Sequence, residues 1–523
     1  MEPAPDPAPP GDTAPENGAT VHRSPPRSAR WPWVGWVLVT CVLWNSCASH
    51  ADSRRSDALL ARGDFPRTPA FALAALRGAG TDDGDLGRYL AYANATLGRP
   101  YAAFYVRPLE GWTGPQPETS GSDPDDPLQT PPVRPDRPLV PYRDFSVEYP
   151  PGFLLLAVPP ALLGLDLDGY RLVFSLWMAL LLTAALLAAV RIGRALRPGE
   201  DLSTVAVATL LALALGTVAV RRFDAIVSLS LCLFLDGCLR RRPVLAGLAL
   251  GAGVVTKIVP VLIVPVALLY WIALRRRRDL WATAAVAAGV TLAVGIPFLA
   301  VAGDHLLDLV RYHVQRPLEV ESTGAALLTI GRFFDPASAW KVASHGFENV
   351  VGPADRYLLP LASIAPLVAT SAILARSAVL TRAAVRRTDG ERLAGEVLVR
   401  AACATLAASM TLGKVFSAQY LTWLLPAGAL VSLLDTGRRR RVALGLLGGA
   451  MLLTQLNQHV FYGMLGSGPH PLMGVLFLLR NGLLLGWAVW ILAPGPAART
   501  SLAESKQPPM SSPGPARQSA VPS

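Results

Sequence analysis

The sequence carries little charge and very little cysteine for its length. Only 16% of its 523 residues are charged, whereas 52% are hydrophobic. Its five cysteines lie in or beside apolar stretches, without C-x-x-C spacing or histidine partners nearby, so we expect neither a disulfide framework nor a zinc site. A composition this apolar excludes an ordinary soluble enzyme and indicates long segments that face lipid.

The sequence also lacks a repeat between its two halves. Secondary transporters commonly show such repeats, with polar groups near the middle of the membrane. Here the unusual polar residues lie at the ends of the apolar segments. We therefore favour an enzyme, with a multi-pass transporter or a lipid-sugar flippase as the alternative.

The positive charge has a pattern that argues against a nucleic-acid partner. The formal net charge is +11, but the arginines form short runs between apolar segments, as in cytoplasmic loops of membrane proteins. The runs are Arg191, Arg194 and Arg197; Arg240–Arg242; Arg275–Arg278; Arg382, Arg386 and Arg387; and Arg438–Arg441. We interpret the charge as a topology signal and expect no nucleic acid to bind.

The apolar segments predict an all-α, polytopic transmembrane helix bundle of about twelve spans, each near the ~20 residues needed to cross a bilayer. The predicted spans are 31–49, 170–192, 202–220, 223–239, 243–257, 258–274, 279–302, 356–379, 393–413, 416–434, 441–459 and 471–492. Residues 152–164 are short and interrupted by prolines, which favours a re-entrant or interfacial segment. Every second loop is then basic, so the topology is consistent with the positive-inside rule.

The same pattern predicts the domain organisation. Residues 1–30 and 496–523 are expected to be disordered cytoplasmic tails of a plasma-membrane protein, and 31–495 a single transmembrane domain. Between the first two spans lies a long external loop, 50–150, in which we expect short helices. Within it, the Pro-, Asp- and Gly-rich residues 111–138 are typical of a flexible insertion.

The densest polar stretch is Pro141–Gly152, at the end of this loop. It combines Asp144, Glu148 and Arg143 with three aromatic rings, immediately before the hydrophobic part of the chain. One interpretation is an interfacial loop whose aromatic side chains lie at the level of the lipid headgroups. The other is a functional site, because further polar residues are predicted on the same side of the membrane.

Those residues come from several loops, and Lys257 is the most unusual. It lies between two apolar segments that are each short for a span, where a lysine is costly unless it snorkels, pairs or meets an anion. The candidate site residues on this face are Asp85, Arg143, Asp144, Glu148, Arg221, Arg222, Asp224, Lys257, His313, Arg316, Glu321, Gln419 and Tyr420.

Five segments together resemble a known family. They are Pro141–Phe145 with Glu148–Pro151, Arg222–Ala225, the glycine-rich run into Lys257–Pro260, Arg316–Ser322, and Ser417–Pro426. In this order they are similar to the GT-C superfamily of integral-membrane glycosyltransferases. The likeness is greatest to the bacterial family 87 polyprenyl-phosphate-mannose-dependent mannosyltransferases, over about residues 30 to 495.

The resemblance implies an inverting transfer of a sugar, with mannose expected, from a polyprenyl-phosphate donor to a glycolipid or glycan acceptor. The reaction would take place on the non-cytoplasmic side of the membrane. In this family the catalytic carboxylate is expected early in the first external loop, before a tyrosine-bearing helix, and Asp85 matches that position best. The long stretch before Asp85 and the insertion at 111–138 depart from the family pattern.

Inversion at an anomeric carbon requires a base for the acceptor proton and donors for the phosphate leaving group. We predict Asp85 as the base, with Asp144 or Glu148 as alternatives that would otherwise orient the acceptor or pair with cations. The predicted phosphate partners are Arg221, Arg222, Lys257, His313 and Arg316. We expect no cofactor and no metal, because a polyprenyl monophosphate carries too little charge to require one.

Overall fold

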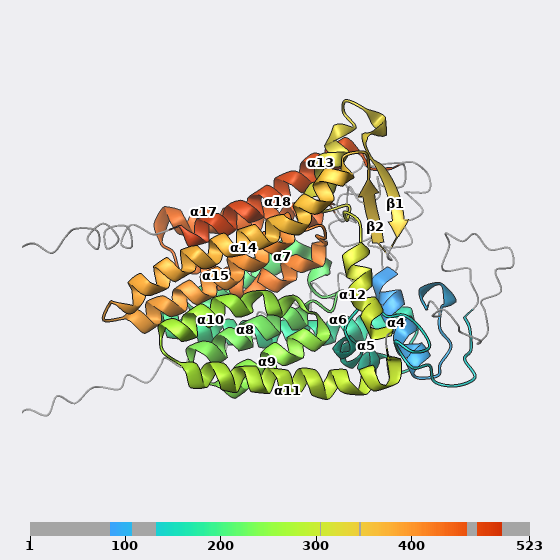
Figure 1. Cartoon of the computed structure of the whole chain (residues 1–523), viewed down its shortest axis with the longest axis horizontal. Coiled ribbons are helices and arrows are strands. Elements are labelled where there is room, and N and C mark those ends of the chain that lie inside the picture. The colour runs from blue at the N-terminus through green and yellow to red at the C-terminus, as the bar shows by residue number, and fades with distance from the viewer. Residues whose placement is uncertain (1–83, 107–131, 304, 345–346, 458–467, 494–523) are drawn as a thin grey trace, which may run out of the picture.

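The protein is a helix bundle with a small two-stranded sheet at one end (Figure 1). The computed structural model describes residues 84–106, 132–303, 305–344, 347–457 and 468–493. The predicted span 31–49, both tails and most of the insertion at 111–138 lie outside these residues. The described residues are mostly helical, which confirms the predicted all-α transmembrane class.

The described residues account for some of the twelve predicted spans by length and composition. Among the described residues, six helices are long and apolar enough to cross a membrane. They are α6 (Leu167–Leu196), α7 (Asp201–Leu215) continued by η4 (Gly216–Ala219), α11 (Arg277–Ala302), α14 (Asp355–Val385), α15 (Gly390–Leu412) and α18 (Pro471–Leu492). The count of about twelve is therefore not confirmed.

The other predicted spans form helices that are shorter or more charged. They are α8 (Ala225–Leu239), α9 (Pro243–Thr256), η5 (Val259–Ile263) with α10 (Val264–Ala273), η7 (Ala418–Leu424) with α16 (Leu425–Leu433), and α17 (Gly437–Leu456). At about 1.5 Å per residue, a helix such as α8 or α9 is ~20 Å long, less than the ~30 Å of a hydrocarbon core. Residues 152–164 form the short helix α5 (Leu154–Ala161), preceded by η3 (Pro151–Phe153).

Several helices end or begin at three breaks, residues 216–224, 257–263 and 413–424, which we call the helix breaks. The first begins at Gly216, whose positive φ of 69° suits glycine. The second follows the last turn of α9, where Pro260 comes soon after Lys257. Elements of the three breaks contact one another directly or through α8 and α15. Polar residues at these breaks are therefore brought together inside the bundle.

The glycine-rich run before Lys257 is explained by close packing of α9 on α11. A Cβ atom on Gly247 would lie 2.6 Å from Val286 Cβ, and one on Gly251 would lie 2.7 Å from Val290 Cβ. Glycines four residues apart are a usual way for two membrane helices to approach closely. The run therefore positions α9, and with it the break that carries Lys257.

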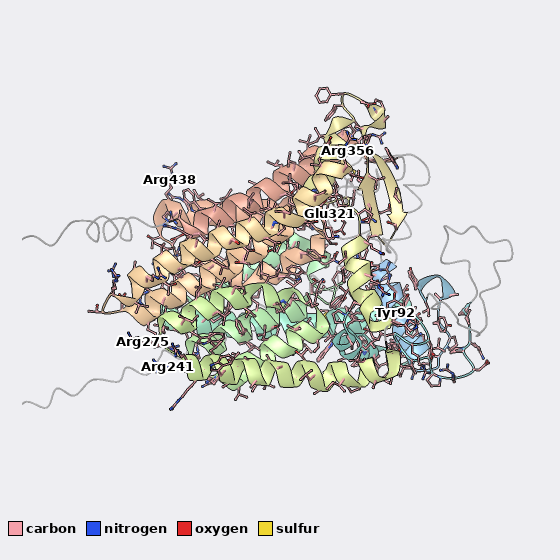
Figure 2. All side chains as sticks on the ribbon, viewed as in Figure 1. Tyr92, Arg241, Arg275, Glu321, Arg356 and Arg438 are labelled. Atoms are coloured by element: carbon pink, nitrogen blue, oxygen red, sulfur yellow. The ribbon has the colours of Figure 1, made fainter. Side chains whose placement is uncertain are left out.

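The two ends of the bundle differ in their polar residues. Figure 2 shows Arg241, Arg275 and Arg438 at one end, and Tyr92, Glu321 and Arg356 towards the other. We call these the arginine-rich end and the site end. The short helices α4 (Gly84–Thr96), α5 and α12 (His305–Gln315) lie at the site end (Figure 1).

A small β-structure, which the sequence did not predict, also lies at the site end. Strands β1 (Trp340–Ser344) and β2 (Phe347–Val351) form an antiparallel hairpin after α13 (Thr323–Gly331). The Val320 N–H donates to Glu348 O at 3.1 Å, and the Val350 N–H donates to Leu318 O at 2.9 Å. The chain before α13 is thereby held along the outer edge of β2.

Candidate active site

Asp85 lies in the first turn of α4, surrounded by cations. Its Oδ2 is 2.8 Å from Arg222 Nε, and its Oδ1 is 3.9 Å from Arg88 Nη1. Burial raises the pKa of Asp85, but the positive charges of Arg222, Arg88, Lys257 and Arg316 outweigh burial, so the pKa is lowered overall. Asp85 is therefore an ionised carboxylate at neutral pH.

Aromatic side chains fix α4 against the bundle beneath Asp85. The ring of Tyr89, one turn after Asp85, lies 6.0 Å from that of Tyr149, 5.0 Å from Phe153 and 5.7 Å from Phe223. These residues come from α4, from the Pro141–Gly152 stretch and its continuation, and from the first helix break. The aromatic residues thus join the three segments that carry Asp85, Glu148 and Arg222.

Glu148 belongs to the same cluster as Asp85. Its Oε1 accepts a hydrogen bond from Arg88 Nη1 at 2.5 Å, and its Oε2 accepts one from the Tyr92 hydroxyl at 2.5 Å. Arg88 therefore lies between the two carboxylates. As alternative bases, Glu148 and Asp85 are close enough to share one cation.

Asp144, in contrast, holds its own loop together. Its carboxylate accepts hydrogen bonds from the Val140 N–H at 2.8 Å, from Arg137 at 2.7 Å and from Arg143 at 3.0 Å. Burial raises the pKa of Asp144, but the hydrogen bonds from Arg137, Arg143 and the Val140 N–H lower it by more than burial raises it. The pKa therefore falls well below its usual range. None of these contacts involves Asp85, so Asp144 and Arg143 have a loop-stabilising role in the described residues.

Lys257 is paired at the helix breaks and does not snorkel. Its Nζ lies 2.7 Å from Asp224 Oδ1, which also accepts a hydrogen bond from Trp423 Nε1 at 2.5 Å. Lys257 Nζ is 4.7 Å from the centre of the Tyr420 ring and 4.9 Å from that of Phe223. The Lys257 ammonium group is thus held in place by a carboxylate and by aromatic rings.

Arg316 faces a carboxylate that the sequence analysis did not select. Its Nη2 is 3.3 Å from Glu319 Oε1, and both side chains are buried. Burial is the main reason that the pKa of Glu319 rises to about 7; Arg316 opposes the rise, and Glu321 adds to it. The available signal was the alternation of Glu319 and Glu321 with the apolar Leu318 and Val320, because residues two apart in an extended segment lie on one face.

Glu321, which we predicted at the substrate, forms a buried ion pair with Arg480 of α18. Arg480 Nη1 donates to Glu321 Oε2, and Arg480 Nη2 donates to Glu321 O at 2.9 Å. Asn481 Nδ2 donates to the same carbonyl at 3.1 Å. These contacts anchor the segment on α18. A lone arginine within the apolar run 471–492 was a signal for this pair that the sequence analysis missed.

The remaining predicted residues lie around the same breaks. Tyr420 stacks on Trp423 with ring centres 4.3 Å apart, and Gln419 Oε1 accepts a hydrogen bond from Ser417 Oγ at 2.6 Å. On α12, burial and then the charge of Arg316 lower the pKa of His313. His313 is therefore mainly neutral at neutral pH. Arg221 is buried beside Arg222 in the chain.

Comparisons with known proteins support the family resemblance found in the sequence motifs. Residues 147–343 match the family model described as glycosyltransferase family 87. This range contains Glu148, Arg222, Lys257 and Glu319, but not Asp85. A search of curated proteins finds no significant match.

Two solved structures are similar to the chain. One is ArnT from Cupriavidus metallidurans bound to undecaprenyl phosphate, with 14% identity over 90% of this chain and 77% of that chain and a TM-score of 0.39. The other is the apo state of the same protein, with 16% identity over 66% of each chain and a TM-score of 0.33. The family match over residues 147–343 confirms the resemblance to family 87. It also favours an enzyme over the transporter or flippase alternative. Together with the helices that are long and apolar enough to cross a membrane, it indicates that the protein is a multi-pass membrane glycosyltransferase.

Proposed function

We propose that this enzyme transfers a sugar, specifically mannose, from a polyprenyl-phosphate donor to a hydroxyl of a glycolipid or glycan acceptor, with inversion at the anomeric carbon. Asp85 acts as the general base. The observation that carries the proposal is the buried, ionised Asp85 carboxylate at the site end, with Arg222 at 2.8 Å and further cations around it.

The charge balance of this cluster suits a phosphate. Four cations and three carboxylates make up this cluster, which leaves one positive charge when all are ionised. The cations are Arg88, Arg221, Arg222 and Lys257, and the carboxylates are Asp85, Glu148 and Asp224. When the bond from the sugar to the phosphate breaks, the lipid phosphate changes from a monoanion to a dianion. The cations therefore stabilise the leaving group more than the bound donor.

The proton balance gives Asp85 its role. The acceptor oxygen forms a bond to the anomeric carbon and loses its proton to Asp85, while the electrons of the breaking bond go to the phosphate oxygen. In the described structure Arg222 pairs with Asp85 and weakens it as a base. A donor phosphate that attracts Arg222 would raise the pKa of Asp85 and leave its oxygen open to the acceptor.

The surroundings of Lys257 support a lipid-linked donor. Ile258, Val261 and Leu262, which directly follow Lys257, expose apolar side chains. In a membrane protein such side chains meet lipid. A polyprenyl chain in the bilayer could lie along this break with its phosphate at Lys257, and membrane lipid surrounds the rest.

The charge distribution supports a site on the external or periplasmic side of the plasma membrane. The arginine-rich end lies opposite the site end (Figure 2). The positive-inside rule assigns such an end to the cytoplasm. Both termini are proposed to be cytoplasmic as well, although the terminal segments lie outside the described residues.

The test is transfer of labelled sugar from polyprenyl-phosphate-mannose in membranes that contain the protein. We expect product with the wild type, none with a nucleotide sugar as donor, and loss of product in Asp85→Asn at equal protein level. Glu348→Gln removes a carboxylate that pairs with Lys341 at 3.4 Å, outside the cluster, and is the matched control.

Two outcomes would change the proposal. Loss of product in Glu148→Gln with Asp85→Asn still active would assign the base to Glu148. No product from any of a panel of lipid-linked sugars with folded protein would contradict the reaction, whereas product from another sugar alone would replace mannose.

A further inference from the structure

Several buried polar atoms near Asp85 have no hydrogen-bond partner among the described residues. They include Arg316 Nε and Nη2, Glu319 Oε2 and the hydroxyl of Tyr149. Arg316 is 3% exposed and Glu319 is 4% exposed, so water is largely excluded. A buried polar group without a hydrogen-bond partner destabilises the folded protein. Native proteins keep few such groups, and each needs an explanation such as a functional role.

Arg316 and Glu319 place donors and an acceptor next to each other. Glu319 Oε1 lies 3.3 Å from Arg316 Nη2, whereas Glu319 Oε2 has no hydrogen-bond partner and can still accept a hydrogen bond. The ring centre of Phe347 lies 4.0 Å from the Arg316 guanidinium carbon and covers one face of that group. The unused N–H groups lie in the guanidinium plane, beside a carboxylate that can only accept when ionised.

This chemistry fits a hydroxyl group better than a phosphate. A hydroxyl both donates and accepts, so it can donate to Glu319 Oε2 while it accepts from Arg316. A phosphate oxygen would satisfy Arg316 but would be repelled by an ionised Glu319. The pair thus differs from Arg222 and Lys257, whose carboxylate partners lie at 2.8 and 2.7 Å.

The backbone around the pair is held from several sides. The Glu319 N–H donates to Lys414 O at 3.0 Å, and the flanking Leu318 and Val320 bond to β2. Glu321 is anchored on Arg480. A recognition group needs such support, because a loosely held side chain loses specificity.

We infer that Arg316 and Glu319 form a pair that binds a non-reacting hydroxyl of a sugar substrate, and that this pair contributes to the choice of sugar. The inference rests on the proposed function. It also moves Arg316 from the predicted phosphate ligands to sugar recognition. The hydroxyl belongs either to the sugar of the donor or to a sugar of the acceptor, and the experiment distinguishes these two.

The first arm measures binding of polyprenyl-phosphate-mannose and of polyprenyl phosphate alone to purified protein in nanodiscs. We expect the wild type to prefer the sugar-bearing lipid. Glu319→Gln should lose about 10- to 100-fold of that preference, the size of one hydrogen bond to a charged group, and keep its affinity for polyprenyl phosphate. Arg316→Lys keeps the positive charge but loses the planar set of guanidinium N–H donors, and it should lose the preference to the same extent. Glu348→Gln should behave as the wild type.

The second arm measures the KM for the acceptor in the transfer reaction. An unchanged donor preference in Glu319→Gln with an acceptor KM raised by the same factor would place the hydroxyl on the acceptor. The inference is overturned if donor preference and acceptor KM are both unchanged in Glu319→Gln. It is also overturned if Glu319→Gln or Arg316→Lys weakens binding of polyprenyl phosphate alone as much as that of the sugar-bearing lipid.

A failure of the proposed function gives a different result. Wild-type protein that is folded but binds neither lipid contradicts the donor class, and the pair is then not a sugar site of this reaction. A wild-type donor preference that survives in both variants, with the acceptor KM also unchanged, contradicts only the pair. Thermal unfolding of each variant shows whether it is folded in the assay.

Discussion

The two ends of the bundle both hold carboxylates paired with arginines, but in different surroundings. At the arginine-rich end, Asp236 faces Arg191 at 2.8 Å and Arg240 at 2.7 Å, and these arginine side chains are 40% and 33% exposed. At the site end, the side chains of Arg316 and Lys257 are only 4% and 13% exposed. The excess positive charge is therefore open to solvent at one end and enclosed at the other.

This difference indicates that the exposed arginines reflect the orientation in the membrane, whereas the enclosed cations are suited to binding an anion. Exposed arginines are screened by water and ions and contribute little to stability through single pairs, and they suit a cytoplasmic face. Enclosed cations interact strongly with any anion that enters, because the surroundings screen them less. Of the two ends, as far as their residues are described, the site end has the electrostatics that suit the proposed phosphate leaving group.

The largest contrast is expected between Asp85→Asn and Asp236→Asn. Asp85→Asn should lower kcat by about 10² to 10⁴, the usual effect of a lost general base, and should also lower Tm, because Asp85 pairs with Arg222. Asp236→Asn removes the carboxylate between two arginines and should lower Tm while leaving the rate per folded molecule nearly unchanged. Transfer rates and thermal unfolding of both proteins test this, and a reversed pattern would contradict the assignment of the two ends.

Arg222→Gln is expected to have the next largest effect. Loss of one electrostatic donor to a leaving group typically costs about 10² to 10³ in rate. The variant should bind polyprenyl phosphate more weakly than the wild type, since Arg222 is proposed to leave Asp85 for the phosphate. The matched control is Arg240→Gln at the arginine-rich end, whose transfer rate should stay within a few-fold of the wild type. Equal rates for the two variants would remove Arg222 from the mechanism.

The comparison also shows what the sequence could predict. Hydrophobic runs and arginine runs were sufficient for the helices and for the separation of the two ends, because both depend on local composition. The number of spans is not confirmed, since a run such as 243–257 is apolar throughout yet forms a helix of only ~20 Å. Helix length depends on where the chain breaks, and several breaks are stabilised by contacts from distant segments.

Several residues selected from the sequence lie close together in the structure, but their pairings were not predicted. Asp85, Arg222, Asp224 and Lys257 were all selected, but the roles of Glu319 and Glu321 were not separated. Which of two alternating glutamates faces the site depends on pairing with β2 and on Arg480, some 160 residues away. Contacts over such distances in sequence leave no periodic pattern, so the sequence alone could not distinguish the two.

Glu319 should make stability depend on pH at the site end. Its pKa is about 7 in the folded protein, against an ordinary value of 4.5. The folded state thus keeps a proton that the unfolded chain loses, so this contribution is present at low pH and is lost as pH rises through 7. Arg316, Glu321, Arg480 and Asp85 are the charged groups that act on it.

Glu319→Gln should therefore raise Tm relative to the wild type at pH 8, by the equivalent of up to about 3 kcal/mol, and by less at pH 5. Thermal unfolding at both pH values checks this, with Glu348→Gln as the control. A gain that is the same at both pH values, or a loss at pH 8, would contradict a buried carboxyl that resists ionisation.

Asp144→Asn is expected to give the smallest change in catalysis. Asp144 was an alternative base, yet its carboxylate accepts hydrogen bonds from Val140, Arg137 and Arg143 and has no described contact with the cations around Asp85. The amide of asparagine can still accept some of these bonds, so we expect kcat to change by less than about tenfold, the effect of a loosened loop. Loss of a general base lowers the rate by at least about 10². A fall in kcat of that size at unchanged Tm would therefore make Asp144 a candidate base again.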